Sequence, residues 1–236
     1  MPSVLISGAN RGLGLEFTRQ YLDDNWRVIA LCRDTDAAMD LSDLGATYAT
    51  LEIFQCDVGD FEAIDEIAQG LRGRTIDVLL NNTGVFGPKR KADGDFRQSF
   101  GHIDFDILSD VLRVNTLAPL KIVEALVDNV LAGEQKKIVI ITSKLGSIAN
   151  TSPGLYAYRT SKAAVNMVMA TLARELGPRG GIVAALNPGW VQTDMGGADA
   201  NLTAAESIGR MRQVIAGLTI EQSGAFLDYD GSTIAW

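Results

Sequence analysis

The chain has 236 residues, of which 47% are hydrophobic and 21% charged, and this composition predicts a single globular domain over residues 1–236. Its apolar runs are far shorter than the roughly 20 residues that a bilayer-spanning helix needs, so no membrane association is expected. A formal net charge of −8 argues against a nucleic-acid partner, because phosphate binding needs a clustered positive surface.

Cysteine and histidine usage sets further expectations. Cys32 and Cys56 are too few for a disulfide framework, and the start of the chain carries no secretory pattern, so a cytoplasmic location is expected. We interpret both cysteines as small buried hydrophobes. His102 is the sole histidine, and without companions at ligand spacing it predicts no metal site. The basic run 89–91 is interpreted as a solvated loop.

Strand-like runs rich in Val, Ile and Leu recur along the chain. Their hydrophobicity is nearly continuous, which is typical of strands that are covered on both faces. A weaker candidate lies at 225–227. The stronger candidates are Val4–Ser7, Arg27–Cys32, Thr50–Gln55, Ile76–Leu80, Lys137–Thr142 and Ile182–Leu186.

Longer amphipathic segments separate these runs. We expect helices at Gly14–Asp24, Phe61–Leu71, Phe105–Leu131, Tyr156–Leu176 and Ala204–Gly217. Alternation of strands and helices implies right-handed crossover units. The predicted fold is therefore α/β, a single doubly wound Rossmann-type domain whose mostly parallel seven-stranded sheet carries helices on both faces.

A glycine-rich turn follows the first strand. Gly8, Gly12 and Gly14 fit the pattern G-x-x-x-G-x-G and directly precede a helix. Glycines there allow a tight turn and let backbone amides approach a pyrophosphate at the positive end of the helix. The spacing differs from the common fingerprint G-x-G-x-x-G, and a purely structural corner is the alternative interpretation.

The end of the second strand indicates which dinucleotide would bind. An acidic residue there would hold a free ribose hydroxyl, but this chain has Cys32 followed by Arg33. Arg11, inside the glycine turn, could reach the same place. Two arginines favour a 2′-phosphate and hence NADP(H) over NAD(H). The alternative is that Arg33 only pairs with Asp34 or Asp36 at the surface.

Tyr158 and Lys162 lie four residues apart, so they share one face of a predicted helix. A free phenol titrates near pH ~10, and a neighbouring ammonium is expected to lower that pKa. This would make Tyr158 a usable general acid/base. By itself, the spacing is common on solvated helices.

Two further polar residues stand out. Ser143 closes a long predicted strand, and in a parallel sheet its hydroxyl would share an edge with the glycine turn. It could bind a substrate carbonyl oxygen, or it could simply cap a turn. No His/Asp partner supports a hydrolase triad. Asn115 interrupts an apolar helical face and needs partners, either a water in a proton path or a backbone carbonyl.

Together these residues resemble the short-chain dehydrogenase/reductase family over essentially the whole chain. Ser7 replaces the threonine that usually opens the glycine motif, and Asn81-Asn82-Thr83-Gly84 is similar to the family's N-N-A-G with Thr83 for alanine. The segment 188–193 resembles the one that meets the nicotinamide carboxamide, and 57–58 the pair beside adenine. The sequence Asn-Arg-Gly-Leu-Gly, the Cys-Arg strand end and the closing residues 230–236 look most similar to carbonyl-reductase-like members related to bacterial C-factor.

The resemblance implies roles for individual residues. Ser143 would polarise the substrate oxygen, Tyr158 would exchange its proton, Lys162 would lower the pKa of the tyrosine and hold the nicotinamide ribose, and Asn115 would keep a water connecting Lys162 to solvent. The implied cofactor-binding residues are Gly8, Asn10, Arg11, Gly12, Leu13, Gly14, Arg33, Asp57, Val58, Asn82, Gly84, Tyr158, Lys162, Pro188, Gly189, Val191 and Thr193.

The first functional hypothesis is an NADP(H)-dependent oxidoreductase that acts on a small-molecule carbonyl or secondary alcohol. The second is a dinucleotide-binding signalling or sensor protein of C-factor type with little or no turnover, and the third is a purely structural protein without cofactor. A homo-oligomer, dimer or tetramer, formed by the long helices is expected. Residues 195–207 are predicted to form a mobile lid. Candidate pocket residues are Phe86, Leu145, Tyr156, Trp190 and Met195.

Overall fold

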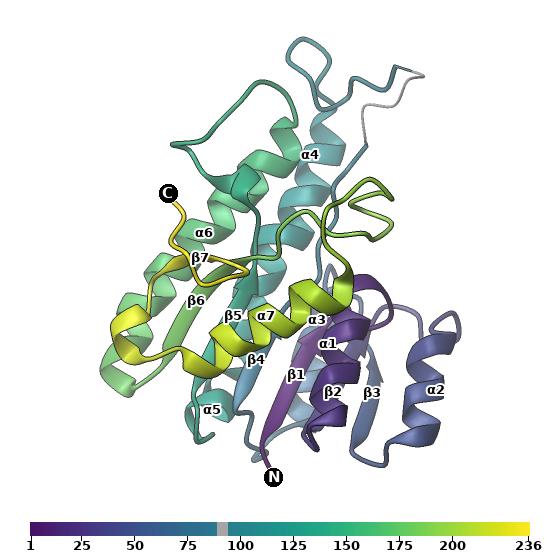
Figure 1. Cartoon of the computed structure of the whole chain (residues 1–236), viewed down its shortest axis with the longest axis vertical. Coiled ribbons are helices and arrows are strands. Elements are labelled where there is room, and N and C mark those ends of the chain that lie inside the picture. Colours follow the sequence, from purple (N-terminus) through teal and green to yellow (C-terminus); the bar gives the residue numbers. More distant parts are fainter. Residues whose placement is uncertain (89–93) are drawn as a thin grey trace.

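In the computed structural model, which describes residues 1–88 and 94–236, the described strands form one seven-stranded sheet. Its order is β3-β2-β1-β4-β5-β6-β7, and every neighbouring pair is parallel (Figure 1). The chain reverses direction across the sheet between β1 and β4, which is where doubly wound folds bind ligands. The strands are β1 (Ser3–Ser7), β2 (Arg27–Cys32), β3 (Leu51–Gln55), β4 (Val78–Asn81), β5 (Lys137–Ile141), β6 (Ile182–Asn187) and β7 (Phe226–Asp228).

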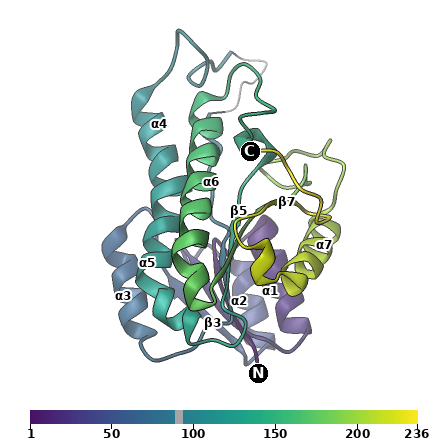
Figure 2. The same cartoon turned by 90° about the vertical axis from the view of Figure 1, so that its left-hand side faces the viewer.

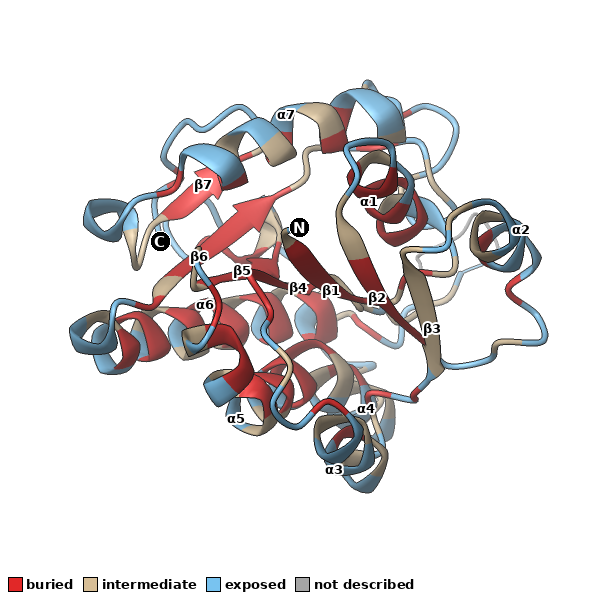
Figure 3. Ribbon diagram, turned by 90° about the horizontal axis from the view of Figure 1, so that it is seen from below, coloured by how far each residue is buried: buried red, intermediate tan, exposed pale blue. Residues whose placement is uncertain are grey.

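Helices cover both faces of the sheet. Figures 2 and 3 show α1, α2 and α7 on one face and α3, α4, α5 and α6 on the other. The predicted Rossmann-type α/β architecture is therefore confirmed. The helices are α1 (Gly12–Asp23), α2 (Met39–Thr47), α3 (Phe61–Gly70), α4 (Phe105–Leu112), α5 (Ala118–Leu131), α6 (Tyr156–Leu176) and α7 (Ala204–Gly217).

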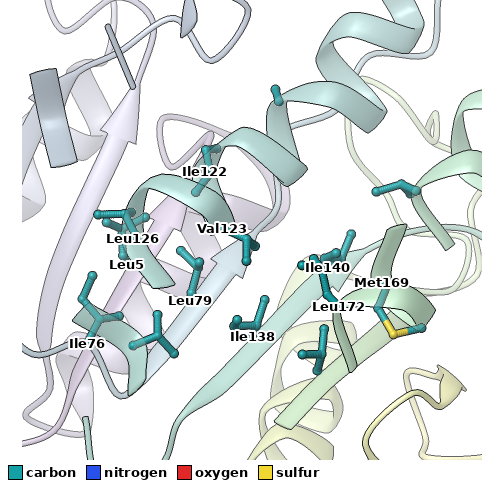
Figure 4. Packing of buried hydrophobic residues seen from close by; sticks show 14 of the residues in the cluster. Leu5, Ile76, Leu79, Ile122, Val123, Leu126, Ile138, Ile140, Met169 and Leu172 are labelled. Carbon is teal, nitrogen blue, oxygen red and sulfur yellow. The ribbon is translucent and has the colours of Figure 1, made fainter. Parts of the chain in front are cut away.

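Two hydrophobic clusters sandwich the sheet. Successive side chains of a strand point to opposite faces, so Leu5 of β1 packs in the cluster beneath α5 and α6 (Figure 4). Its neighbours Val4 and Ile6 pack in the cluster beneath α1 and α7. All three are fully buried. Burial on both faces of the sheet explains why the sequence of a strand such as β1 is a continuous apolar run.

Some expected boundaries differ from the structure. Helix α2 was not expected; its sequence contains Gly45 and only Leu41 of it is buried, so it has little helical periodicity. The strand expected from Ile76 begins at Val78, because the Ile76 amide donates to the Asn129 carbonyl of α5 instead. The segment expected to be a lid, 195–207, overlaps the start of α7 at Ala204, and its closure stays a prediction.

The predicted helix 105–131 is one continuous helical segment with an irregular centre. Helices α4 and α5 are joined by a wide π-helical turn at Arg113–Leu117. Such a turn places an extra residue in one turn of helix and recurs at functional sites. Among the helices that the structure describes, none is long and apolar enough to cross a membrane.

Candidate functional site

The turn between β1 and α1 can only be built from glycine at its key positions. Gly8 and Gly12 have φ of +67° and +54°, the left-handed region that side chains with a Cβ disfavour. A Cβ on Gly14 would lie 2.0 Å from the Gly8 carbonyl oxygen. The three glycines are therefore required by the shape of the turn, with Gly14 allowing close packing of the helix.

The end of β4 holds this turn in place. The Asn82 side-chain amide donates to the carbonyls of Ser7 and Gly8, at 3.0 and 3.2 Å. The Ser7 hydroxyl accepts from the backbone amides of Asn82 and Thr83, each at 3.1 Å. Serine thus supplies the hydroxyl expected of the family's threonine, and the two strand ends are joined at the topological switch point.

A cleft of about 600 Å³ opens above this edge of the sheet. Most of the predicted site residues line this cleft: Gly8, Asn10, Arg11, Gly12, Leu13, Arg33, Asp57, Val58, Asn82, Gly84, Tyr158, Lys162, Pro188 and Thr193. Its lining also includes Cys32, Asp34, Thr83, Val85 and Met195, of which only Met195 had been expected to line the pocket.

Five of the predicted site residues do not line the cleft. Gly14, Asn115 and Ser143 are not among its lining residues, and neither are Gly189 and Val191. Gly189 has φ +81°, and a Cβ there would lie 2.6 Å from Leu202 Cδ1. Val191 is buried and forms a bridge with Leu202. These last two residues shape the segment that follows β6.

Two guanidinium groups lie at the mouth of the cleft. Arg11 forms an ion pair with Asp194 at 3.0 Å, and both side chains are largely exposed. Arg33 is also exposed. No ion pair in the described ranges joins Arg33 to Asp34 or Asp36; instead the Asp34 carboxylate accepts the backbone amides of residues 36 and 37.

Lys162 is buried on the first half of α6, and its Nζ lies 5.8 Å from the ring centroid of Tyr158. Its ammonium donates to the Ile141 carbonyl at 3.0 Å. Burial lowers the pKa of Lys162 to about 8. Gly84 lies beside it, and a Cβ there would make an ordinary van der Waals contact with Nζ at 3.4 Å.

The Tyr158 side chain differs from the expectation in one respect. Burial raises the pKa of Tyr158 to about 12, and a hydrogen bond with the Ser143 side chain acts in the opposite direction without offsetting it. The expected lowering of this pKa by Lys162 is therefore wrong for the residues of this chain alone. Withdrawal of the phenol from water outweighs the neighbouring groups.

Of the two alternatives for Ser143, the structure shows the turn cap, and substrate binding stays a prediction. Its Oγ accepts the Leu145 amide at 3.1 Å and so caps the short 3₁₀ turn Lys144–Gly146. The same side chain hydrogen-bonds Tyr158. A turn cap thus fixes a hydroxyl beside the phenol.

Asn115 lies in the π-helical turn and is almost completely buried. Its Oδ1 accepts the Val85 amide and its Nδ2 donates to the Val85 carbonyl, both at 2.8 Å. Nδ2 also donates to Ser161 Oγ at 3.0 Å. The partners of Asn115 are therefore the backbone of Val85, which lines the cleft, and Ser161 of helix α6.

Sequence motifs gave no indication of the network behind Ser143. Asn187, at the end of β6, donates to the buried Asp228 carboxylate at 2.7 Å and accepts the Lys144 amide at 3.0 Å. Lys144 also forms an ion pair with Asp228. These residues lie far apart in the sequence, so only the pairing of β5, β6 and β7 brings them together.

The remaining expectations have mixed outcomes. Cys32 and Cys56 are buried and free, as expected, and burial raises the pKa of both thiols, that of Cys56 to about 11. His102 is exposed, and the described ranges hold no cluster of metal-ligating side chains. The basic run 89–91 lies outside the described residues. Of the candidate pocket residues, Met195 lines the cleft and the Phe86 ring lies 4.5 Å from that of Tyr158.

Comparison with known proteins identifies the family. The family described as short chain dehydrogenase matches residues 2–202. The chain belongs to this family. It is 41% identical over 162 residues to the C-signal of Myxococcus xanthus, covering 68% of this chain and 93% of that protein.

Solved structures of short-chain dehydrogenases agree. Carbonyl reductase Sniffer of D. melanogaster superimposes with a TM-score of 0.91 at 33% identity, covering 100% of both chains. The NADPH-bound carbonyl reductase from chicken fatty liver gives a TM-score of 0.89 at 32% identity, covering 100% of this chain and 99% of that one. The prediction of a carbonyl-reductase-like, C-factor-like oxidoreductase of this enzyme family is confirmed.

Proposed function

We propose that this short-chain dehydrogenase uses NADP(H) to interconvert a carbonyl compound and a secondary alcohol, with Tyr158 as the acid/base. The main support is that Tyr158 and Lys162 line the same cleft as the glycine turn. Folding alone does not require an acid/base pair and a dinucleotide-type turn to line the same cleft. Hydride transfer does require it, because the cofactor and the proton donor must both reach the substrate.

The residues of the cleft fit a phosphorylated dinucleotide. The open turn at Gly8 and the amino-terminal end of α1 would hold the pyrophosphate. The exposed guanidiniums of Arg11 and Arg33 would pair with a 2′-phosphate. Asp57 and Val58 would lie beside adenine, and Lys162 would hold the nicotinamide ribose. When bound, the cofactor supplies or accepts the hydride.

The side chains around Tyr158 support its proposed role in proton transfer. The phenol is protonated at neutral pH, so it can donate a proton to a carbonyl oxygen as negative charge develops there, although its raised pKa makes it a weaker acid than free tyrosine. Ser143, hydrogen-bonded to Tyr158, would orient the same oxygen. The Lys162 ammonium would stabilise the phenolate that results.

Asn115 supports the site from behind. The two hydrogens of the Asn115 side-chain amide both bond to protein acceptors. Asn115 could therefore bind a water linked to Lys162 only through an oxygen atom, as an acceptor. Its direct effect is to fix Val85 at the wall of the cleft.

The test is loss of NADPH absorbance with a panel of aldehydes, ketones and diketones. Tyr158→Phe should abolish turnover and leave the NADPH Kd within about twofold, since the ring remains. Tyr48→Phe is the matched control, because the Tyr48 hydroxyl donates to the exposed Asp23 carboxylate and lines no part of the described cleft; it should leave turnover unchanged. Retained turnover in Tyr158→Phe would refute the proposed acid/base.

A second candidate function is signalling through cofactor binding, which the identity to C-signal favours. It predicts tight NADPH binding without turnover on any member of the panel. Binding by nucleotide fluorescence together with turnover would exclude it, and absence of binding would exclude both functions. The expected homo-oligomer stays a prediction that light scattering can test.

A further inference from the structure

Helix α6, which carries Tyr158, begins without a cap of its own. Its preceding residue, Leu155, adopts a left-handed φ of +56°, and its side chain makes no capping hydrogen bond. The first amides of a helix lack partners within the helix and need acceptors from elsewhere. Because Tyr158 lies in this first turn, whatever supplies the acceptors also fixes the start of the catalytic helix.

Gln98, in the segment before α4, supplies two of these acceptors. Its backbone carbonyl accepts the Tyr156 amide at 3.1 Å. Its side-chain Oε1 accepts the Tyr158 amide itself at 3.0 Å. Gln98 is only 3% exposed, so water does not compete for these bonds.

The other end of the same carboxamide holds the segment after β4. Its Nε2 donates to the carbonyls of Phe86 and Pro88, at 2.9 and 2.7 Å. Gly87, between them, has φ +74°, and a Cβ there would lie 3.1 Å from Nε2. The glycine therefore lets the backbone wrap closely around the amide.

The ring of Phe86 completes the connection. It lies 4.5 Å from the Tyr158 ring, centroid to centroid, at an interplanar angle of 34°. Tyr158 is thus held at its backbone by Oε1 of Gln98 and at its ring by Phe86, whose carbonyl the same amide binds. One buried side chain connects the segment after β4 to the first turn of α6.

We propose that Gln98 is a positioning residue, which aligns Tyr158 by locking Phe86 and the first turn of α6 to each other. The inference rests on the proposed function, in which Tyr158 transfers the proton. Gln98 touches no reacting group, so its effect is on geometry alone. A misplacement of about 1 Å can cost a reaction on the order of 100-fold in rate.

The chemistry of the carboxamide makes the proposal testable, because the position needs two donors and one acceptor. Gln98→Leu removes all three hydrogen bonds. Gln98→Glu keeps the acceptor for the Tyr158 amide, but its carboxylate would face two carbonyl oxygens and could donate to neither. Protonation restores one donor, and burial raises the pKa of such a carboxyl group.

The experiment compares wild type, both Gln98 variants and a matched control. Asn129 of α5 is also buried and donates its Nδ2 to two backbone carbonyls, those of Leu71 and Arg74, each at 2.7 Å. It lies outside the cleft. Asn129→Leu should lower the melting temperature, while kcat per folded molecule remains unchanged.

Gln98→Leu is expected to lower kcat about 10- to 100-fold, with the NADPH Kd within about twofold of wild type. Hydrogen exchange should accelerate together in residues 84–88 and 156–160. In Gln98→Glu, kcat should rise relative to wild type as the pH falls from about 8 to 6. Because Gln98→Glu preserves the size of the side chain, it carries the test if Gln98→Leu does not fold.

Several results would overturn the proposal. Faster exchange in both segments with an unchanged kcat would mean that Gln98 has only a structural role. Faster exchange in one segment alone would mean that the two are not connected through this amide. Turnover retained by Tyr158→Phe would refute the proposed function instead, and hydrogen exchange would still decide whether Gln98 connects the two segments.

Discussion

Replacing Lys162 by methionine is expected to stabilise the protein at neutral pH while it abolishes turnover. Lys162 is 4% exposed, and Nζ donates to the Ile141 carbonyl. Burial lowers its pKa from 10.5 to about 8. The folded protein thus holds an ammonium in a place that favours the neutral amine, and methionine fills similar space without charge.

The size of the effect follows from the change in pKa. At about 1.36 kcal/mol per pKa unit, keeping Lys162 protonated costs the folded state about 3 kcal/mol. The hydrogen bond from the Lys162 ammonium to the Ile141 carbonyl is charge-assisted, so its loss offsets about 2 kcal/mol of the gain. We therefore expect Lys162→Met to raise the free energy of unfolding by about 1 kcal/mol at pH 7.

The pH dependence has a definite sign. Below pH ~8 the lysine is protonated in both folded and unfolded states, so the full cost is present. As the pH rises from about 8 to 10.5, the folded state loses its proton first and wild type gains stability relative to the variant. The difference should shrink by about 3 kcal/mol across this window, most of it by pH ~10.

Urea unfolding of both proteins at several pH values between about 7 and 10 measures this difference. Lys137→Met is the control: Lys137 is also buried, but its Nζ donates to two carbonyls, those of Ile215 and Ala216 at the end of α7. Burial lowers the pKa of Lys137 as well, but loss of two charge-assisted hydrogen bonds outweighs the gain from removing its charge, so that variant should lose stability and keep turnover. A Lys162→Met protein that is less stable than wild type at pH 7, or a difference that does not change with pH, would refute the desolvation argument.

Three further perturbations test other parts of the site. Arg33→Ala should weaken NADPH binding at least about tenfold by calorimetry and leave NADH within about twofold, because charge-assisted hydrogen bonds are worth about 1.5–3 kcal/mol; equal losses for both cofactors would contradict the 2′-phosphate assignment. Asp228→Ala should lower the free energy of unfolding by about 1–3 kcal/mol and reduce kcat, since it leaves the buried Asn187 amide behind Ser143 without its acceptor; a change under about 0.5 kcal/mol in urea unfolding would count against this network. Gly14→Ala should abolish NADPH binding measured by fluorescence, because its Cβ would overlap a carbonyl oxygen of the turn. Gly209→Ala on α7, where the nearest atom lies 3.8 Å away, should bind normally and gain up to about 1 kcal/mol of stability in urea.

Features encoded locally could be predicted from the sequence. The bounds expected for β2, α6 and α7 agree with the structure, because continuous apolar runs and helical periodicity are properties of short segments. The glycine turn and the four-residue spacing of Tyr158 and Lys162 are also local. Alternation of strands and helices then brings their ends to one edge of the sheet, which explains why most predicted site residues line one cleft.

Only the tertiary structure determined the environment of these residues. Gln98 contacts Tyr158 across 60 positions of sequence, and Asn187 contacts Asp228 across 41; neither pair has a spacing that a local pattern could reveal. The pKa of Tyr158 has the same origin. Desolvation depends on which atoms exclude water from all sides, so packing raised a pKa that the spacing to Lys162 alone had indicated would fall.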